Sequence, residues 1–318
     1  DGHHGGVRRD PRKPMNLAET VERAKGLNKH AVAKLVALFE DTRTSAAAQR
    51  AEVLALLPEG SATVIGITGT PGAGKSSLVA RLVPRMLAES DLSVAVLAVD
   101  PSSHVSGGAL LGDRTRTRFA TGDKRAYFRS QSNAAELGGL APTTFQVSRL
   151  LKRLFDVVLV ETVGIGQSEL DIRYLADHVY LVLQPLGGDE IQFLKAGIIE
   201  IPDSFILNKC DDPAAGMSYY QLRSSLSLAR PFDEDQPPVY KTSARTGEGV
   251  DEVAMDMLTV TPRHTDAERE EYFFGRWVED EWGATGRRYM DGRNLLADGF
   301  DPAQAAFGEG IVRWLTKA

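Results

Sequence analysis

Cysteine is almost absent from this chain, since Cys210 is the single cysteine among 318 residues. A disulfide framework and a thiolate metal cluster within one chain are therefore excluded, and we expect a reducing, cytoplasmic location. Apolar runs of membrane length are also lacking. Runs such as 157–160 have the size of a strand rather than the ~18 residues of a membrane span, so we expect no membrane segment.

Positive charge is not in excess either, because 37 Lys and Arg residues stand against 43 Asp and Glu residues, a formal net charge of −6. This balance gives no general attraction to nucleic acid or to an anionic membrane. Hydrophobic residues make up 42% and charged residues 25%, which is typical of a globular protein and excludes a collagen-like or wholly disordered chain. The length suggests two domains, or one large domain with appendages.

The N-terminal part of the sequence divides into two segments. Residues 1–14 have no apolar core and so form no secretory signal; we expect them to be disordered or foreign to the native chain. Residues 15–60 are predicted to form an N-terminal helical arm, because their apolar side chains recur at spacings of three and four. Ser45 is expected to cap a third helix of this arm through 46–57.

Short β-rich runs alternate with helix-length segments over residues 61–262. These runs are nearly continuous in apolar residues, which is typical of strands buried on both faces of a parallel sheet. We therefore predict an α/β fold with a mostly parallel sheet flanked by helices. The expected strands are 64–68, 94–99, 157–160, 179–183, 204–207 and 239–241.

The tail, residues 263–318, is predicted to be a helical extension and a dimerisation region. It holds 9 of the 23 aromatic residues, including all three tryptophans, in 56 residues. So many aromatic side chains need a surface to pack against. That surface is either the protein's own core or a second chain, and the sequence leaves both open.

A phosphate-binding loop is indicated at 69–76, where Gly-Thr-Pro-Gly-Ala-Gly-Lys-Ser follows an expected strand and opens an expected helix. In this context backbone N–H groups and the positive end of the helix converge on phosphate oxygens. The lysine is expected to reach the β- and γ-phosphates, and the serine to ligate Mg²⁺. The candidate phosphate-site residues are Gly69, Pro71, Gly72, Ala73, Gly74, Lys75, Ser76 and Ser77.

A guanine-binding motif, Asn208, Lys209 and Asp211, follows the expected strand 204–207. An Asp carboxylate at such a strand end can accept hydrogen bonds from N1–H and the 2-amino group of guanine, which adenine lacks. Sites built on such bonds discriminate by ~10⁴ or more, so we predict GTP rather than ATP. Ser243 and Ala244 end the next strand, where a backbone N–H can meet guanine O6. Cys210 is interpreted as a loop residue and not as a nucleophile.

Two carboxylates at neighbouring strand ends, Asp100 and Glu161, suit a Mg²⁺ ion that bridges β- and γ-phosphates. The alternative is that each caps the end of its strand. Gly164, three residues after Glu161, is placed to present its N–H to the γ-phosphate and so to sense hydrolysis.

Catalytic assistance is less clearly marked in the sequence. Ile165 stands where a water-orienting Gln is often found, and Gln167 lies two residues further on. Intrinsic hydrolysis is therefore expected to be slow without a partner. Arg114 is a candidate for transition-state charge, the alternative being a solvated basic face. The candidate catalytic residues are Lys75, Asp100, Glu161, Gly164, Gln167 and Arg114.

Three longer segments extend these motifs: 100–116, which begins Asp-Pro-Ser-Ser-His; 161–169, which begins Glu-Thr-Val-Gly; and 188–200, which begins Gly-Asp-Glu-Ile-Gln. With the motifs above, they make residues 17–260 resemble the MeaB/ArgK/MMAA GTPases, the chaperones of adenosylcobalamin-dependent acyl-CoA mutases. The resemblance implies a P-loop NTPase fold and a homodimer joined through C-terminal helices. It also implies a further switch loop near 188–195 and Mg²⁺ contacts at Ser76, Asp100, Asp113 and Glu161.

The function that the resemblance implies is a G-protein that uses GTP/GDP and Mg²⁺ to gate adenosylcobalamin loading onto a mutase and to protect that mutase. Cobalamin would be met only through the partner. The partner is expected to be methylmalonyl-CoA mutase or a related isobutyryl- or hydroxyisobutyryl-CoA mutase. The alternatives are a GTPase serving nickel insertion and an accessory role in amino-acid transport.

Overall fold

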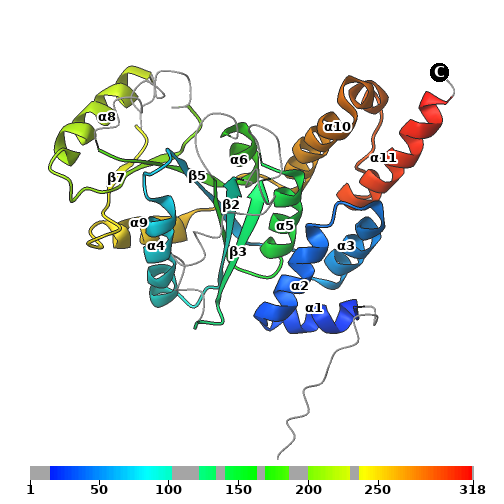
Figure 1. The fold of residues 1–318 in the computed structure, drawn as a ribbon, viewed down its shortest axis with the longest axis horizontal. Coiled ribbons are helices and arrows are strands. Elements are labelled where there is room, and N and C mark those ends of the chain that lie inside the picture. The colour runs from blue at the N-terminus through cyan, green and yellow to red at the C-terminus, as the bar shows by residue number, and fades with distance from the viewer. Residues whose placement is uncertain are drawn as a thin grey trace, which may run out of the picture.

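The fold is built around one parallel sheet (Figure 1). In this computed structural model of the chain, the residues described are 15–101, 122–133, 140–162, 169–185, 200–229 and 236–316. Among these residues seven strands pair in parallel in the order β3-β2-β4-β1-β5-β6-β7. The strands are β1 (Thr63–Gly69), β2 (Val94–Pro101), β3 (Ala126–Asn133), β4 (Val157–Glu161), β5 (His178–Leu183), β6 (Ser204–Leu207) and β7 (Val239–Lys241).

Helices cover both faces of the sheet, as its doubly buried strands require. In Figure 1, α4 and α9 lie on one side of the sheet. Helices α5 and α6 lie on the other side, together with α1 to α3 and with α10 and α11. The helices are α1 (Leu17–Lys25), α2 (Lys29–Phe39), α3 (Thr44–Leu56), α4 (Lys75–Glu89), α5 (Pro142–Lys152), α6 (Glu169–Leu175), α8 (Ala215–Ala229), α9 (Val250–Thr259), α10 (Asp266–Met290) and α11 (Phe300–Leu315).

The two faces of the sheet carry different cores because side chains alternate along each strand. On β1, Ile65 and Ile67 face α4 and α9, whereas Val64 belongs to the core on the opposite face. That opposite core is much the larger. It continues from the sheet through α5 and α6 into α1 to α3, α10 and α11.

The aromatic side chains of the tail pack into this larger core. Phe145 of α5 stacks on Phe273 with ring centroids 4.5 Å apart, and Phe307 lies edge-on to Phe274 and Trp277. Of the two surfaces that the sequence left open for these aromatics, the described residues therefore supply the protein's own core.

Buried ion pairs join the arm to the tail, and we call this group the arm–tail joint: Arg50 of α3, Arg149 of α5, Glu270 of α10 and Asp301 of α11. Asp301 accepts from Arg50 Nε at 2.8 Å and from Arg149 Nη1 at 2.7 Å, while Arg149 Nη2 lies 2.7 Å from Glu270. Asp301 is 2% exposed and Arg50 3% exposed, so their charges are compensated inside the protein.

Two local expectations were wrong. Strand β3 was not predicted, because the segment Ala-Tyr-Phe-Arg-Ser-Gln-Ser-Asn lacks an apolar run; it pairs with β2 along its whole length as the edge of the sheet. Ser45 does not cap α3, since the helix begins one residue earlier, at Thr44, with Arg43 at the cap position and no side-chain cap bond.

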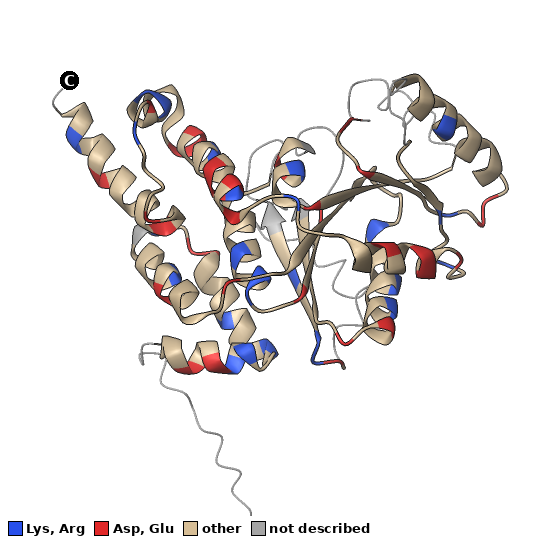
Figure 2. Ribbon diagram, turned by 180° about the vertical axis from the view of Figure 1, so that it is seen from behind, with Lys and Arg blue, Asp and Glu red and all other residues tan. Residues whose placement is uncertain are grey.

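Charged residues of both signs occur along α10 and in the arm (Figure 2). Within the part of the chain that the structure describes, no helix combines the length and apolar character needed to cross a membrane.

Candidate functional site

The phosphate loop lies between β1 and α4, at the edge where the carboxyl ends of the strands meet. We call this the carboxyl edge and include in it the loops 69–74, 208–211 and 242–249. Gly74, the residue before α4, has φ +89°, and a Cβ there would lie 2.7 Å from Asn208 Nδ2. Only glycine fits both the left-handed backbone and this close approach. The first turn of α4 therefore opens directly from the loop and has no side-chain cap.

The side chain of Lys75 folds back onto the start of this loop. Its ammonium group donates to the carbonyl oxygens of Gly69 at 2.7 Å and Thr70 at 3.2 Å, and its side chain is buried. A buried ammonium group needs such partners, because burial without them is costly. The loop thus orients a positive charge beside the N-terminal, positive end of α4, an arrangement suited to an anion.

Ser76 and Glu161 meet beside the loop. Sheet register places Glu161 of β4 level with Ile67 of β1, and Ser76 Oγ donates to Glu161 Oε1 at 2.6 Å. Glu161 is 7% exposed. A hydroxyl and a carboxylate oxygen converging in a buried position make a donor set that suits Mg²⁺. Next to them, Thr162 donates to Thr68 across the same two strands at 2.9 Å.

Asn208 joins three loops of the carboxyl edge. Its Nδ2 donates to the carbonyl of Ala73 in the phosphate loop at 2.8 Å. Its Oδ1 accepts from Thr242 Oγ1 at 3.2 Å and from the Ala244 N–H at 3.1 Å. The side chain is buried, so these bonds are shielded from competing water. Asn208 therefore fixes the relative positions of the phosphate loop and the loop after β7.

Asp211 lies at the outer part of the same edge, half-buried. Its carboxylate accepts from Ser243 Oγ at 2.5 Å and pairs with Arg245 Nη2 at 2.5 Å. The Ser243 hydrogen bond and, secondarily, Arg245 lower the pKa of Asp211 below its usual range. The carboxylate is thus ionised near neutral pH and is already matched to two donors, the number that a guanine edge offers.

The residues beside Asp211 complete the loop. Lys209 has a left-handed backbone, φ +61°, and its Nζ donates to Gln184 Oε1 at 2.6 Å. Cys210 donates its thiol hydrogen to the Leu207 carbonyl, and burial raises the pKa of the thiol. A neutral, hydrogen-bonded thiol agrees with the interpretation of Cys210 as a loop residue.

Most predicted nucleotide residues come together at the carboxyl edge, from Gly69 to Ser77 on one side and from Asn208 to Ala244 on the other. The backbone of Asp100 lies one residue before the end of β2, level with Ser132, but its side chain is outside the described part. Also outside the described residues are Asp113, Arg114, Gly164, Gln167 and the expected switch loop 188–195.

Three contacts at this edge were missed by sequence reasoning. Arg245 pairs with Asp211, Gln184 accepts from Lys209, and Arg81 of α4 donates to the backbone of the loop after β7. All three lie outside the motifs. Their roles depend on which loops the sheet brings together, for which the sequence carried no signal.

Comparison with known proteins agrees with this geometry. The family described as Methylmalonyl Co-A mutase-associated GTPase MeaB matches residues 32–272. A presumed GTPase of Pyrococcus horikoshii is 41% identical over 241 residues, which are 74% of this chain and 75% of that protein. The mitochondrial methylmalonic aciduria type A homolog of Mus musculus is 40% identical over 194 residues, 59% of this chain and 46% of that protein.

A solved structure shares the fold. The crystal structure of an LAO/AO transport system kinase superposes with a TM-score of 0.64 at 24% identity, covering 96% of this chain and 99% of that one. The match shows the parallel-sheet architecture alone. Taken with the extent of the family match and the phosphate loop, it leads to one conclusion: the chain belongs to the MeaB family and is a P-loop GTPase.

Proposed function

We propose that this GTPase is a cytoplasmic chaperone of an adenosylcobalamin-dependent acyl-CoA mutase, whose nucleotide state gates loading of the cofactor and protects the mutase. The observation that carries the proposal is the match to the mutase-associated family from the arm into the tail. The name of the mouse relative, which refers to methylmalonic aciduria, supports the same class of partner. Cobalamin would be met only in the mutase.

The proposed nucleotide pocket is the carboxyl edge. The loop 69–77 would cradle the phosphates, and Asp211 would accept from the guanine edge. The Ala244 N–H, which donates to Asn208 Oδ1, would be shared with guanine O6. The Asn208 bonds to Ala73 and Ala244 support this assignment, because they keep the two halves of such a pocket in a fixed relation. Lys209 would lie along the base.

Magnesium fits the buried oxygen pair of Ser76 and Glu161. We propose that these two residues, with Asp100 and Asp113, would hold the ion directly or through water. When bound, it would neutralise charge on the β- and γ-phosphate oxygens.

The chain's own contribution to hydrolysis would come first from Lys75. In the loop its ammonium donates to two carbonyl oxygens, and it would turn to donate to a bound triphosphate in exchange for a present acceptor. Such a pre-oriented cation stabilises the charge that develops on the transferred phosphoryl group. Gln167 and Arg114 are proposed to assist in orienting water and in adding charge, and turnover is proposed to be slow without the partner.

A route from the nucleotide to the tail passes through Asp171. This buried side chain lies on α6, which follows the segment after Glu161. It accepts from the Leu140 N–H at 2.9 Å and from the Tyr272 hydroxyl of α10 at 2.7 Å. Loss of the γ-phosphate would alter the Gly164 segment and, through α6, the position of α10. This contact supports a state-dependent surface that the mutase reads, to which the loop 188–195 would also contribute.

The units of the chain are proposed to be an arm (15–60), a GTPase domain (61–262) and a tail (263–318) that joins two copies. Val312 and Leu315 on α11 remain partly exposed, at 52% and 46%, and support a further contact at the end of the tail. Light scattering of the purified protein would give the mass of a dimer.

The decisive experiment is capture of the partner. Immobilised protein, loaded with GDP or with a non-hydrolysable GTP analogue, would be incubated separately with methylmalonyl-, isobutyryl- and hydroxyisobutyryl-CoA mutase. We expect one mutase to bind in a nucleotide-dependent manner and to accelerate GTP hydrolysis. Binding of none of the three would contradict the proposal.

Two controls sharpen this test. Lys75→Ala should retain no nucleotide-dependent difference in mutase binding, because it would not distinguish the two loading states. Metal analysis of the purified protein addresses the nickel alternative, since bound nickel without mutase binding would favour that function instead.

A further inference from the structure

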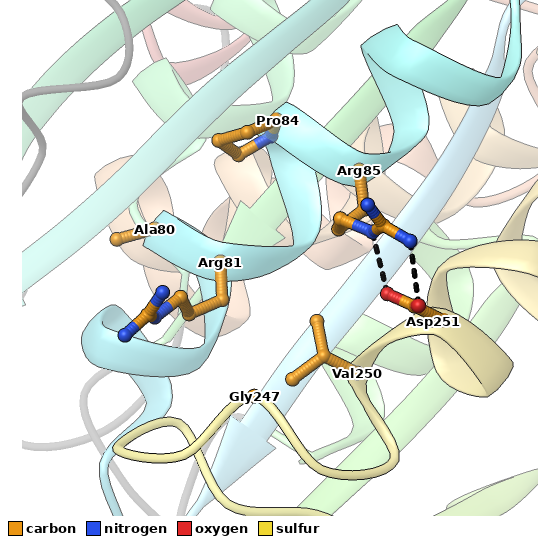
Figure 3. A pocket seen from close by; sticks show the side chains of 7 residues that line it. All are labelled: Ala80, Arg81, Pro84, Arg85, Gly247, Val250 and Asp251. Carbon is orange, nitrogen blue, oxygen red and sulfur yellow. Dashed lines mark hydrogen bonds and ion pairs between the residues drawn. The ribbon is translucent and has the colours of Figure 1, made fainter.

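Arg81 bridges the phosphate-loop helix and the loop that follows β7. It lies on α4, six residues after Lys75, with an exposed side chain. Its Nε donates to the carbonyl oxygen of Ala244 at 3.1 Å and its Nη2 to that of Arg245 at 3.2 Å. In Figure 3 its side chain extends from α4 above the loop that carries Gly247.

These two bonds act on the part of the loop that faces the proposed base. Ala244 is held from both sides, since its N–H donates to Asn208 Oδ1 at 3.1 Å and its carbonyl accepts from Arg81. Ser243, one residue earlier, donates to Asp211. The orientation of successive peptide groups at 243–245 therefore depends on Asn208 on the inner side and on Arg81 on the outer side.

Ala244 packs against the core between α4 and α9, but the space beside the rest of its loop is open. A surface pocket of about 390 Å³ lies between α4 and the loop, lined by Ala80, Arg81, Pro84, Arg85, Gly247, Val250 and Asp251 (Figure 3). The Arg81 bonds therefore act together with the packing of Ala244 to set the direction of the carbonyl groups at 244 and 245.

Arg85, one turn further along α4, makes a different kind of contact. Its guanidinium forms a two-bond ion pair with Asp251 in the first turn of α9, at 2.5 Å for each bond. The side chains of Arg85 and Asp251 are 44% and 64% exposed. This pair ties helix to helix and does not touch the backbone at 243–245, which makes Arg85 the matched control for Arg81.

We propose that Arg81 is a positioning residue for guanine recognition: from the phosphate-loop helix it orients the backbone at 244–245, and so aligns the Ala244 N–H and Asp211 with the base. This inference rests on the proposed guanine pocket. Hydrogen bonds weaken steeply when their angles are lost, so a small rotation of these peptide groups lowers affinity for guanine. Adenine makes neither bond and is insensitive to the change.

The test compares GDP and ADP affinities, measured by calorimetric titration, in wild type and variants. Arg81→Met keeps an unbranched, mostly apolar side chain and removes its donors. We expect GDP affinity to fall by about threefold to tenfold, the range for charged hydrogen bonds at an exposed site, while ADP affinity changes by less than about twofold. Arg81→Lys retains a donor and should recover part of the loss. Arg85→Met should leave the GDP-to-ADP ratio within about twofold of wild type.

The possible results separate the inference from the pocket on which it rests. An unchanged GDP-to-ADP ratio in Arg81→Met, or an equal fall in Arg85→Met, overturns the positioning role while the guanine pocket stands. A wild-type protein without guanine preference, or an Asp211→Asn variant that keeps it, overturns the pocket and the inference together. Should Arg81→Met fail to fold, Arg81→Leu provides the same donor-free comparison, with melting temperature as the check.

Discussion

In the arm–tail joint, buried and partly buried arginines pair with carboxylates from other helices. At the carboxyl edge, by contrast, charged side chains pair with backbone carbonyls, hydroxyls and one exposed arginine. Arg50 and Asp301 are sealed inside the protein. Lys75 and Asp211, by contrast, have partners that belong to loops: Gly69 for the lysine and Ser243 for the carboxylate. Charges paired with each other in the interior fix the architecture. Charges held by loop groups at strand ends can exchange those partners for a ligand.

Breaking the joint should give the largest effect. Asp301→Ala leaves Arg50 buried without its carboxylate, and loss of one partner of such a pair costs about 3–5 kcal/mol of unfolding free energy. Denaturant unfolding checks this value. Glu309→Ala is the control on the same helix, because its pair with Arg313 is exposed and should matter by less than about 0.5 kcal/mol. Equal losses of unfolding free energy in both variants would show that the buried ion pair of Arg50 and Asp301 stabilises the protein no more than an exposed pair does.

Removing the phosphate-loop cation should act on chemistry instead. Lys75→Ala is expected to lower GTP hydrolysis by about a hundredfold or more and to weaken GTP binding, because the loop loses its fixed positive charge. Single-turnover hydrolysis measures the effect. Lys25→Ala on α1, whose exposed side chain pairs with Glu22, is the control and should leave turnover unchanged. Wild-type turnover in Lys75→Ala would refute the assignment of the loop.

A smaller effect is expected at the base side of the edge. Asp211→Asn replaces one acceptor oxygen by an NH2 group, which donates and cannot accept the second guanine N–H bond, so preference for GTP over ATP should fall by about tenfold to a hundredfold. Parallel titrations of both nucleotides measure the ratio. Asp212→Asn, at the neighbouring position, should keep the preference. An unchanged ratio in Asp211→Asn would count against the base site.

The smallest effect concerns pH. Because Ser243 lowers the pKa of Asp211 below its usual 3.8, the carboxylate stays ionised on both sides of neutrality. Its contribution is present above the ordinary Asp pKa and is lost only as pH falls through the lowered value. Guanine preference should therefore vary by less than about twofold between pH 5 and 8. Ser243→Ala should move the onset of acid loss to higher pH, and a wild-type loss already at pH 6 would contradict this account.

Apolar runs and motifs in the sequence predicted most strands of the sheet correctly. The apolar runs gave β1, β2, β4, β5, β6 and β7, and the glycine-rich loop was placed between a strand and a helix, as found. Strand β3 escaped because it is an edge strand with polar residues such as Arg129 and Gln131, whose partner is supplied by β2. The cap of α3 was predicted two residues too late, at Ser45 instead of Arg43, since helix ends depend on backbone geometry as much as on a capping side chain.

The site divides in the same way. The phosphate and base motifs were visible because each keeps its chemistry within a few consecutive residues. The sequence did not indicate the contacts of Arg81, Gln184 and Arg245. Each of these residues contacts a residue that lies far from it in the sequence, and only the fold brings the two together. From the sequence alone, a basic residue on a helix face is interpreted as exposed to solvent, because its neighbours in the fold are not known.

The sequence by itself determined which chemistry is present: a loop that only glycines can form around Lys75, a carboxylate after β6, and strands apolar enough to require helices on both faces. The tertiary structure alone decided which of these groups meet. Strand register brought Ser76 to Glu161, and Asn208 joined Ala73 to Ala244, because the order of strands in a parallel sheet differs from their order in the chain.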